Sequence, residues 1–338
     1  MTNTNRNDKR PAVSRSFLRR KGLIVVLVLL VTVGSILYAL ADRYLIPHVE
    51  AVVTDAPVTA AGSGASGVTQ AASAAETGTS TSAETEASAD DWSYSSDDVD
   101  IRIKQVVTGS GADQITYYVA DVVLQDAADL KSALAHNSFG TNITDKTSNI
   151  AADAGAILAI NGDYYGFRDD GVIIRNGTLY RDEPARSAVA LMNDGTMRTY
   201  DETVTSSSEL IESGVLQTLS FGPILVQNGE IAGDFDSVSI DRNFGNRSIQ
   251  DANPRTAIGM VSANHYVFVV VDGRSDESRG MTLDELAAVM RDLGATEAYN
   301  LDGGGSSTMY FRGRVVNNPQ GEHKERGVSD ILYVGEGE

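Results

Sequence analysis

Three stretches of the sequence place a carboxylate and at least one glycine directly after an apolar run. They are "AILAINGD" (156–163), "VFVVVDGR" (267–274) and "AYNLDGGGSS" (298–307). Carboxylates held at the exits of buried strands are suited to acid, base or nucleophilic chemistry on a rigid scaffold. Asp-Gly and Asn-Gly are also ordinary turn pairs, and turn formation alone explains any one of them. A triple glycine followed by two serines exceeds what a tight turn needs, so we expect the three acidic tips to converge on one cleft.

Two arginines precede other apolar runs and could face that cleft. Arg255 lies in "NPRTAIG" and Arg326 in "ERGVSDILYV". A single arginine is most often a surface residue or half of a local salt bridge. Beside an acidic cleft, however, a guanidinium group is well suited to bind an anion, because its forked donors match phosphate.

Several chemistries lack their sequence patterns. There is no G-x-x-x-x-G-K-[ST] nucleotide loop, no G-x-G-x-x-G after a strand and no G-x-S-x-G nucleophile elbow. The chain has no cysteine and four widely spaced histidines, which argues against zinc. We expect that no cofactor is required. The three aspartates are compatible with a hard cation such as Ca²⁺, but no EF-hand loop is present, and the sequence leaves metal dependence open.

The elements that must position these residues are mainly strands. Four segments place glycine after Asn, Asp or Arg between apolar alternations and predict β-hairpins. These segments are "VIIRNGTLYR", "ALMNDGTMRTY", "ILVQNGEIAG" and "MYFRGRVVNN". Thr282, Glu285 and Gly294 predict a capped helix, and a second helix is expected over 148–155. The predicted class is α+β, with mixed, largely antiparallel sheets, several hairpins and a few packed helices.

The N-terminal third predicts a membrane anchor and a tether. Residues 1–21 form a basic cytoplasmic head, and the uncharged residues 22–41 are long enough to span a bilayer as a signal anchor. Cleavage after "ALA" at 39–41 is the alternative. Residues 42–95 are rich in Ala, Ser, Thr and Gly and predict a disordered linker. The catalytic domain is then expected over 96–338, outside the cell membrane.

Charge separates the head from the rest of the chain. Of the 27 basic and 46 acidic residues, the first 21 positions hold seven basic and one acidic, which leaves 20 basic and 45 acidic beyond them. An acidic body argues against nucleic acid as a partner. The sequence gives no indication of oligomeric state.

The order of several motifs resembles the phosphodiester glycosidase family. The motifs are "AINGDYYG", "FGPILVQNG", "NPRTAIG", "VFVVVDGR", "TLDELAAVMRDLGATEAYNLDGGGSSTMYFRGRVVNNP" and "ERGVSDILYV". The resemblance covers roughly residues 156–334. It implies hydrolysis of the glycosidic C1–O bond in sugar-1-phosphate diesters, with a phosphorylated glycan or sugar phosphate as substrate.

The resemblance also implies roles for individual residues. Asp302 is the expected nucleophile or base, with Asp272 next and Asp163 as a third catalytic carboxylate. The expected substrate-binding residues are Asn161, Arg255, Arg274, Asn300, Gly303, Gly304, Gly305, Ser306, Ser307 and Arg326. The glycines would let backbone N–H groups approach the ligand, and the arginines would stabilise the departing phosphate. Tyr164, Tyr165 and Phe167 either line the sugar or pack.

Two other functions fit the same residues. One is a glycoside hydrolase that acts on non-phosphorylated glycans. The other is a non-catalytic protein that binds or assembles exopolysaccharide at the membrane. The sugar, the aglycone and the stereochemical outcome do not follow from the sequence.

Overall fold

The computed structural model describes residues 15–53, 88–238, 240 and 248–335, and for residues 15–25 only the backbone. The chain divides into two compact units, Met1–Pro47 and His48–Glu338. In the first unit, α1 (Arg15–Tyr44) is a single helix whose segment Val26–Tyr44 is long and apolar enough to cross a membrane. This agrees with the predicted anchor in length and composition.

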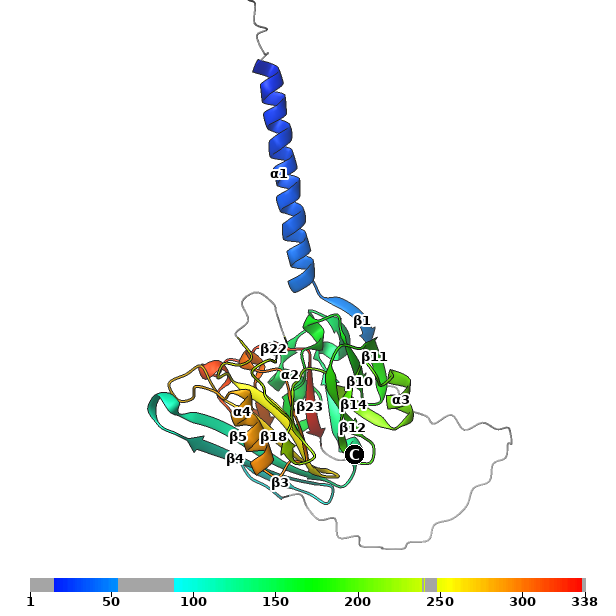
Figure 1. Cartoon of the computed structure of the whole chain (residues 1–338), viewed down its shortest axis with the longest axis vertical. Helices are drawn as coiled ribbons and strands as arrows, with labels where there is room; N and C mark the ends of the chain where they lie inside the picture. The colour runs from blue at the N-terminus through cyan, green and yellow to red at the C-terminus, as the bar shows by residue number, and fades with distance from the viewer. Residues whose placement is uncertain (1–14, 54–87, 239, 241–247, 336–338) are drawn as a thin grey trace, which may run out of the picture. The chain divides into compact units, whose positions relative to one another are not determined.

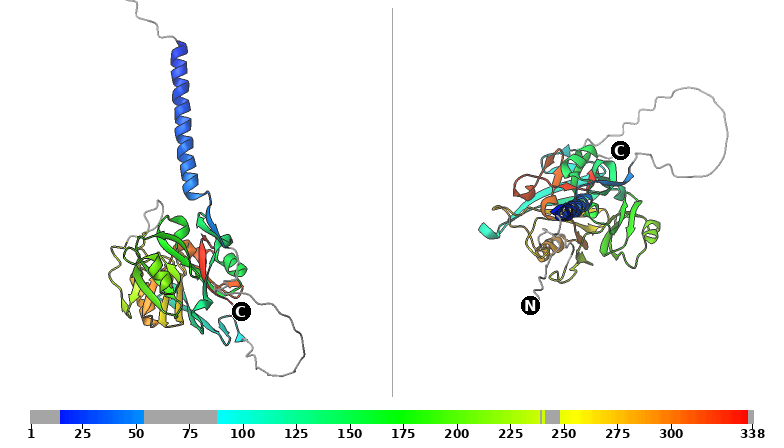
Figure 2. Two further views of the ribbon diagram at one scale, coloured as in Figure 1. Left: turned by 90° about the vertical axis from the view of Figure 1, so that its right-hand side faces the viewer. Right: turned by 90° about the horizontal axis from the view of Figure 1, so that it is seen from above.

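The second unit is built on a nine-stranded sheet in which every neighbouring pair is antiparallel (Figure 1). Its strands, in spatial order, are β16 (Glu230–Ile231), β15 (Ile224–Gln227), β19 (Glu297–Asn300), β17 (Arg255–Ser262), β18 (His265–Val271), β5 (Ile115–Leu124), β4 (Val99–Thr108), β3 (Ser93–Ser95) and β2 (Ser88–Ala89). Figure 2 shows the same unit from two further directions.

A five-stranded antiparallel sheet packs against it. Its strands are β21 (Arg314–Val315), β20 (Met309–Phe311), β9 (Ala156–Asn161), β23 (Asp330–Gly335) and β6 (Leu130–Leu134). Smaller sheets are formed by β13 (Met197–Asp201), β12 (Ser187–Met192) and β14 (Val215–Leu219), by β10 (Gly171–Arg175) with β11 (Thr178–Glu183), and by β22 (Gly327–Val328) with β8 (Asp145–Lys146). Short 3₁₀ turns join several of these strands.

The strands with continuous apolar sequences, β9 and β18, are covered on both faces. In β18, Phe268 and Val270 belong to the core shared with β9 and β23, whereas Val267 and Val269 pack with α4 (Leu283–Asp292). On the far side of the five-stranded sheet, α2 (Thr147–Asp153) covers Ala159. The layers are therefore helix, sheet, sheet, helix, and alternate side chains of one strand are buried on opposite faces.

The local predictions are confirmed. All four hairpins form with the expected glycine turns, and α4 has a capping box made by Thr282 and Glu285 and ends before Gly294 at φ +85°. A further helix, α3 (Ser207–Glu212), was not predicted, although Ser206 and Glu209 form a capping box at its start. The α+β class with largely antiparallel sheets is also confirmed.

The expected linker over 42–95 differs from the structure at both ends. β1 (His48–Val52) pairs with β7 (Ser138–Thr141) inside the second unit, and β2 and β3 occupy residues 88–95. These segments have too few residues to signal strands by alternation. β1 in addition pairs with a strand distant in sequence, whereas β2 and β3 pair with near neighbours in the chain. The remainder of the predicted tether, residues 54–87, lies outside the described residues.

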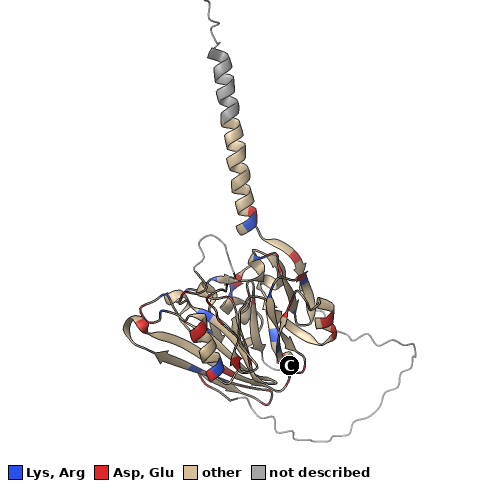
Figure 3. Ribbon diagram, viewed as in Figure 1, with Lys and Arg blue, Asp and Glu red and all other residues tan. Residues whose placement is uncertain are grey.

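Asp and Glu lie on several elements of the second unit, including α3 and α4 (Figure 3). This agrees with the acidic composition of the chain beyond its head.

Candidate active site

Antiparallel pairing brings the start of β17 and the ends of β18 and β19 to the same end of the nine-stranded sheet. β17 lies between β18 and β19, with Arg255 opposite Val271 and Ala257 opposite Asn300. The beginning of β17 therefore lies where β18 and β19 end. The exits of β18 and β19, two of the three acidic strand ends, therefore lie at the same end of this sheet.

Asn161, at the end of β9, links the five-stranded sheet to this end of the nine-stranded sheet. Its amide nitrogen donates to the Asp302 carbonyl oxygen at 2.8 Å, and its side-chain oxygen accepts from Thr256 Oγ1 at 2.7 Å. The side chain is fully buried and does not line the pocket described below. Asn161 thus fixes the position of Asp302 and does not itself reach a ligand in this arrangement.

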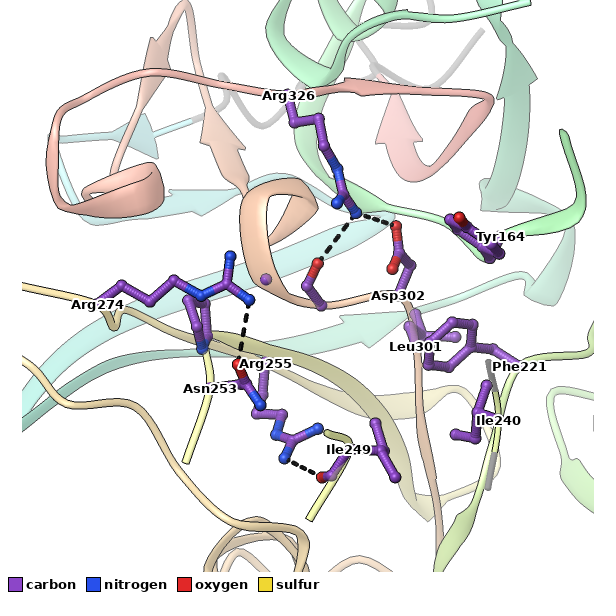
Figure 4. A pocket seen from close by; sticks show the side chains of 13 residues that line it. Tyr164, Phe221, Ile240, Ile249, Asn253, Arg255, Arg274, Leu301, Asp302 and Arg326 are labelled. Carbon is purple, nitrogen blue, oxygen red and sulfur yellow. Dashed lines mark hydrogen bonds and ion pairs between the residues drawn. The ribbon is translucent and has the colours of Figure 1, made fainter. Parts of the chain in front are cut away.

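A pocket opens at this end of the sheet, where β17 begins and β18 and β19 end (Figure 4). It contains about 660 Å³ of space between atoms, part of it open solvent. Its lining residues are Tyr164, Phe221, Ile240, Ile249, Asn253, Pro254, Arg255, Arg274, Leu301, Asp302, Gly303, Gly304 and Arg326. Among these described residues there are three arginines and a single carboxylate. The pocket is therefore cationic, although the chain as a whole is acidic.

Asp302 supplies that carboxylate. It accepts a hydrogen bond from Arg326 Nη2 at 2.9 Å, and Figure 4 shows the two side chains pointing toward each other. Burial raises the pKa of Asp302, and the nearby Arg326 and Ser306 oppose that rise. A carboxyl group in this position can titrate closer to neutrality than an exposed aspartate.

Arg326 is oriented by the glycine-serine segment. Its Nε and Nη2 both donate to Ser306 Oγ, at 3.0 and 2.6 Å, and Nη2 also approaches the Gly303 carbonyl oxygen at 3.3 Å. Its side chain remains 43% exposed, whereas the Asp302 side chain is 11% exposed. Arg326 can therefore contact a ligand while it is held against Asp302.

Arg255 is buried and its guanidinium group is held by backbone carbonyls. It donates to the carbonyl oxygens of Met281, Ile249 and Asp251 at 3.0, 2.7 and 2.8 Å. Among the described residues no carboxylate lies within ion-pair distance of it. Burial and the neighbouring Arg274 lower the pKa of Arg255 to about 10, so it stays charged at neutral pH. Arg255 therefore adds positive charge to the pocket wall while its guanidinium group is tied to the backbone.

Arg274 approaches the pocket from the loop after β18. Its Nη2 donates to Asn253 Oδ1 at 3.1 Å (Figure 4), and its backbone φ is +63°. Positive φ is uncommon for a residue with a Cβ atom and marks a backbone held by its surroundings. Arg255, Arg274 and Arg326 line the same pocket as Asp302, and of the three only Arg326 has a described hydrogen bond to the Asp302 carboxylate.

The three glycines make room mainly for groups of the protein itself. A Cβ atom on Gly303 would lie 2.7 Å from the Pro254 carbonyl oxygen, and one on Gly304 would lie 3.0 Å from Arg274 Nη2. The Gly304 N–H donates to the Pro254 carbonyl oxygen at 2.9 Å. The expectation that this N–H faces a ligand is therefore wrong. A Cβ on Gly305 would lie 3.3 Å from Arg326, so the glycines allow two pocket arginines to approach the backbone closely.

The predicted convergence of three carboxylates is wrong, because Asp163 and Asp272 lie elsewhere. Asp163 is buried and accepts hydrogen bonds from Arg175 Nη2, Tyr165 N and Ser220 N. Burial opposes its ionisation, but Arg175 and the backbone donors hold the pKa of Asp163 below its usual value. Arg175 also donates to Asp330 at 2.7 Å, which makes Asp163 part of a buried structural network.

Asp272 faces a different pocket from Asp302. Its Oδ1 accepts from Asn317 Nδ2 at 3.0 Å and from Asn318 N at 2.9 Å. Burial raises the pKa of Asp272, and those two donors oppose the rise. Asp272 and Arg274 line different pockets, although only Gly273 lies between them.

Asn300 and Ser307 are buried behind the pocket and do not line it. The Asn300 amide nitrogen donates to the Gly222 carbonyl oxygen at 2.8 Å. Within the described chain, Asn300 Oδ1 and Ser307 Oγ have no hydrogen-bond partner. The structure therefore gives no direct ligand contact for either predicted substrate-binding residue.

The aromatic wall of the pocket was only partly anticipated. Tyr164 lines the pocket, Tyr165 is buried against Phe139, and Phe167 stacks on Tyr164. Phe221 and Asn253 also line the pocket and were not predicted to do so, although they begin the motifs "FGPILVQNG" and "NPRTAIG". Arg168 was not predicted either.

The guanidinium carbon of Arg168 lies 5.2 Å from the ring centre of Tyr164 and 5.0 Å from that of Phe221. The run "YYGFR" at 164–168, which interleaves aromatic residues with a cation, was the available signal.

Comparison with known proteins places residues 154–335 within the phosphodiester glycosidase family model. The chain is 31% identical over 205 residues to the SPbeta prophage-derived uncharacterized protein YomE of Bacillus subtilis (strain 168), over 58% of this chain and 30% of that protein. It is 28% identical over 158 residues to N-acetylglucosamine-1-phosphodiester α-N-acetylglucosaminidase of Bos taurus, over 43% of this chain and 29% of that protein. The chain thus spans less than a third of the length of these two relatives.

A solved structure supports the same fold. The catalytic domain of zebrafish N-acetylglucosamine-1-phosphodiester α-N-acetylglucosaminidase, auto-inhibited by its pro-peptide, superposes with a TM-score of 0.56 at 22% identity. The match covers 71% of this chain and 84% of that chain. At this identity the likeness concerns the fold.

Proposed function

Because the chain belongs to the phosphodiester glycosidase family, we propose that it hydrolyses the glycosidic C1–O bond of sugar-1-phosphate diesters. The observation that carries the proposal is the charge of the pocket, whose described lining includes Arg255, Arg274 and Arg326 but a single carboxylate, Asp302. An anionic ester is the substrate class that such a pocket attracts. The bovine relative is named for a substrate of this kind.

The leaving group explains why one carboxylate is sufficient. An ordinary glycosidase uses two, one of which protonates an alkoxide as it departs. A phosphomonoester has a second pKa of about 6 and leaves without that proton. Arg255, Arg274 and Arg326 stabilise its charge as the bond breaks.

Asp302 acts at the anomeric carbon. Its ionised carboxylate either attacks C1 and is later displaced by water, or takes a proton from the attacking water. In both routes the electron pair of the C1–O bond leaves with the phosphate oxygen, and C1 gains a hydroxyl group from water. Arg326 favours the ionised form of Asp302 and contacts the departing phosphate.

The location of the reaction follows from the N-terminal unit. We propose that α1 crosses the cell membrane once, with the basic head in the cytoplasm and the second unit outside. The length and apolar composition of Val26–Tyr44 support this assignment. The substrate would then be a phosphorylated glycan at the cell surface or in the surroundings.

A substrate comparison tests the function. The full chain in detergent is incubated with a GlcNAc-α-1-phosphate diester and, separately, with a neutral α-GlcNAc glycoside. Release of GlcNAc with a phosphomonoester product is the expected result. Turnover of the neutral glycoside alone would assign an ordinary glycosidase, and binding of either compound without turnover would assign a non-catalytic glycan-binding protein.

A further inference from the structure

A second pocket lies on the other side of the loop that follows β18. It contains about 830 Å³ of space between atoms, part of it open solvent. Its walls come from the β4–β5 hairpin, from the loop after β18 and from the segment after β21. The lining residues that matter here are Gln105, Val107, Tyr118, Asp272, Glu277 and Asn317.

The charge of this pocket is opposite to that of the first pocket, called the arginine pocket because Arg255, Arg274 and Arg326 line it. Its described lining residues include two carboxylates, Asp272 and Glu277, and no lysine or arginine. A phosphate would be repelled there. The described residues also contain no group of three His, Cys, Asp or Glu side chains that could hold a metal ion. A neutral ligand rich in hydroxyl groups fits the remaining chemistry.

The polar groups of the pocket are held in place by the scaffold. Asp272 is 5% exposed, and its Oδ1 is fixed by Asn317 Nδ2 at 3.0 Å and by Asn318 N at 2.9 Å. Asn317 Nδ2 also donates to the Ser307 carbonyl oxygen at 3.0 Å, next to the glycine-rich segment. Asn317 is thus committed to the scaffold, and the Asp272 carboxylate it holds is a preorganised acceptor that can bind hydroxyl groups with little ordering cost.

Apolar side chains also line this second pocket. Tyr118 lines the pocket and accepts a hydrogen bond from Gln105 Nε2 at 3.1 Å, and Val107, 56% exposed, lies on the neighbouring strand. Small-ligand sites combine an apolar surface of this kind with a few oriented polar groups. A sugar ring presents both, in its C–H face and its hydroxyl edge.

We propose that this second pocket binds a neutral sugar residue, separately from the phosphate-bearing unit. Asp272 lines it, while Arg274, two residues later, lines the arginine pocket, so one loop separates a neutral from an anionic binding site. The choice of a sugar over another polyol rests on the proposed glycosidase function. A glycan chain with one phosphodiester and several neutral units would use both pockets.

The test measures sugar binding without turnover. N,N′-diacetylchitobiose and maltotriose are titrated into the full-length protein in detergent, as wild type and as three variants, by calorimetry and saturation-transfer NMR. Val107→Arg fills the rim from an exposed position, and Asp272→Asn removes the buried charge. Asp302→Asn alters only the arginine pocket and is the matched control.

We expect at least one of the two sugars to bind the wild type, with about tenfold weaker affinity in Val107→Arg and in Asp272→Asn and a change below twofold in Asp302→Asn. Loss of sugar binding in Asp302→Asn with retention in Val107→Arg would overturn the proposal. Binding of neither sugar by the wild type would also overturn it. Hydrolysis of the phosphodiester, measured separately on the wild type, shows whether the proposed function fails independently of this pocket.

Discussion

The carboxylate of Asp302 and the guanidinium group of Arg326 lie 2.9 Å apart, although 24 residues separate them in the chain. The carboxylate is almost buried and the arginine is 43% exposed on its side chain. One member of the pair is thus protected from solvent and the other remains accessible. A ligand phosphate that contacts Arg326 is thereby brought next to Asp302.

Asp302→Asn should abolish hydrolysis while the fold is retained. The amide has the same shape but neither attacks carbon nor takes a proton, so we expect kcat to fall by at least about 1,000-fold. The free energy of unfolding should change by no more than about 1–2 kcal/mol, because the lost ion pair is partly exposed. Steady-state kinetics and urea unfolding check both values. Substantial remaining activity would remove Asp302 from the reaction.

The pH dependence of the rate should report the Asp302–Arg326 pair. Burial raises the pKa of Asp302 and Arg326 opposes that rise. Since the ionised carboxylate is the reactive form, kcat/KM should increase with pH through this pKa. Arg326→Gln removes the opposing charge, so the acidic limb of the profile should move to higher pH. An unchanged limb would mean that another group sets the profile.

Substitution of Arg255 should lower the stability of the fold more than substitution of Arg326. Arg326→Ala should raise KM and lower kcat with little effect on stability, since its side chain is partly exposed. Arg255→Ala should also lower activity, and in addition destabilise the fold by about 2–4 kcal/mol, because three backbone carbonyls lose a buried donor.

Urea unfolding and kinetics on both variants separate these effects. Full activity in both would contradict the assignment of these arginines to phosphate binding. Equal stability of the two variants would contradict the structural role given to Arg255.

Gly304→Ala should reduce activity by displacing Arg274. Gly304 has φ +64°, and a Cβ atom there would lie 3.0 Å from Arg274 Nη2. Gly313 has φ +87° and nothing within 4 Å of its Cβ position, so Gly313→Ala is the matched control. Both substitutions should cost about 1 kcal/mol of stability through the backbone. Only Gly304→Ala should raise KM for the phosphodiester, and a similar rise in both would refute the close-approach argument.

The sequence by itself determined the elements of this protein and much of its cationic site. Asn-Gly and Asp-Gly pairs specify the hairpins, and Thr282 with Glu285 specifies the start of α4, because these signals act over a few residues. Arg255 and Arg326 were identified because a charged residue at the edge of an apolar run is conspicuous in the sequence alone.

Only the tertiary structure decided which carboxylates share a pocket. Asp163, Asp272 and Asp302 occupy equivalent positions after apolar strands, but Asp163 meets Arg175, Asp272 meets Asn317 and Asp302 meets Arg326. Those partners lie 12, 45 and 24 residues along the chain, on other elements, and the direction of each side chain depends on how these elements pack. The apolar pattern of a strand indicates which residues are buried. The partner of a buried charge is instead set by contacts between different elements.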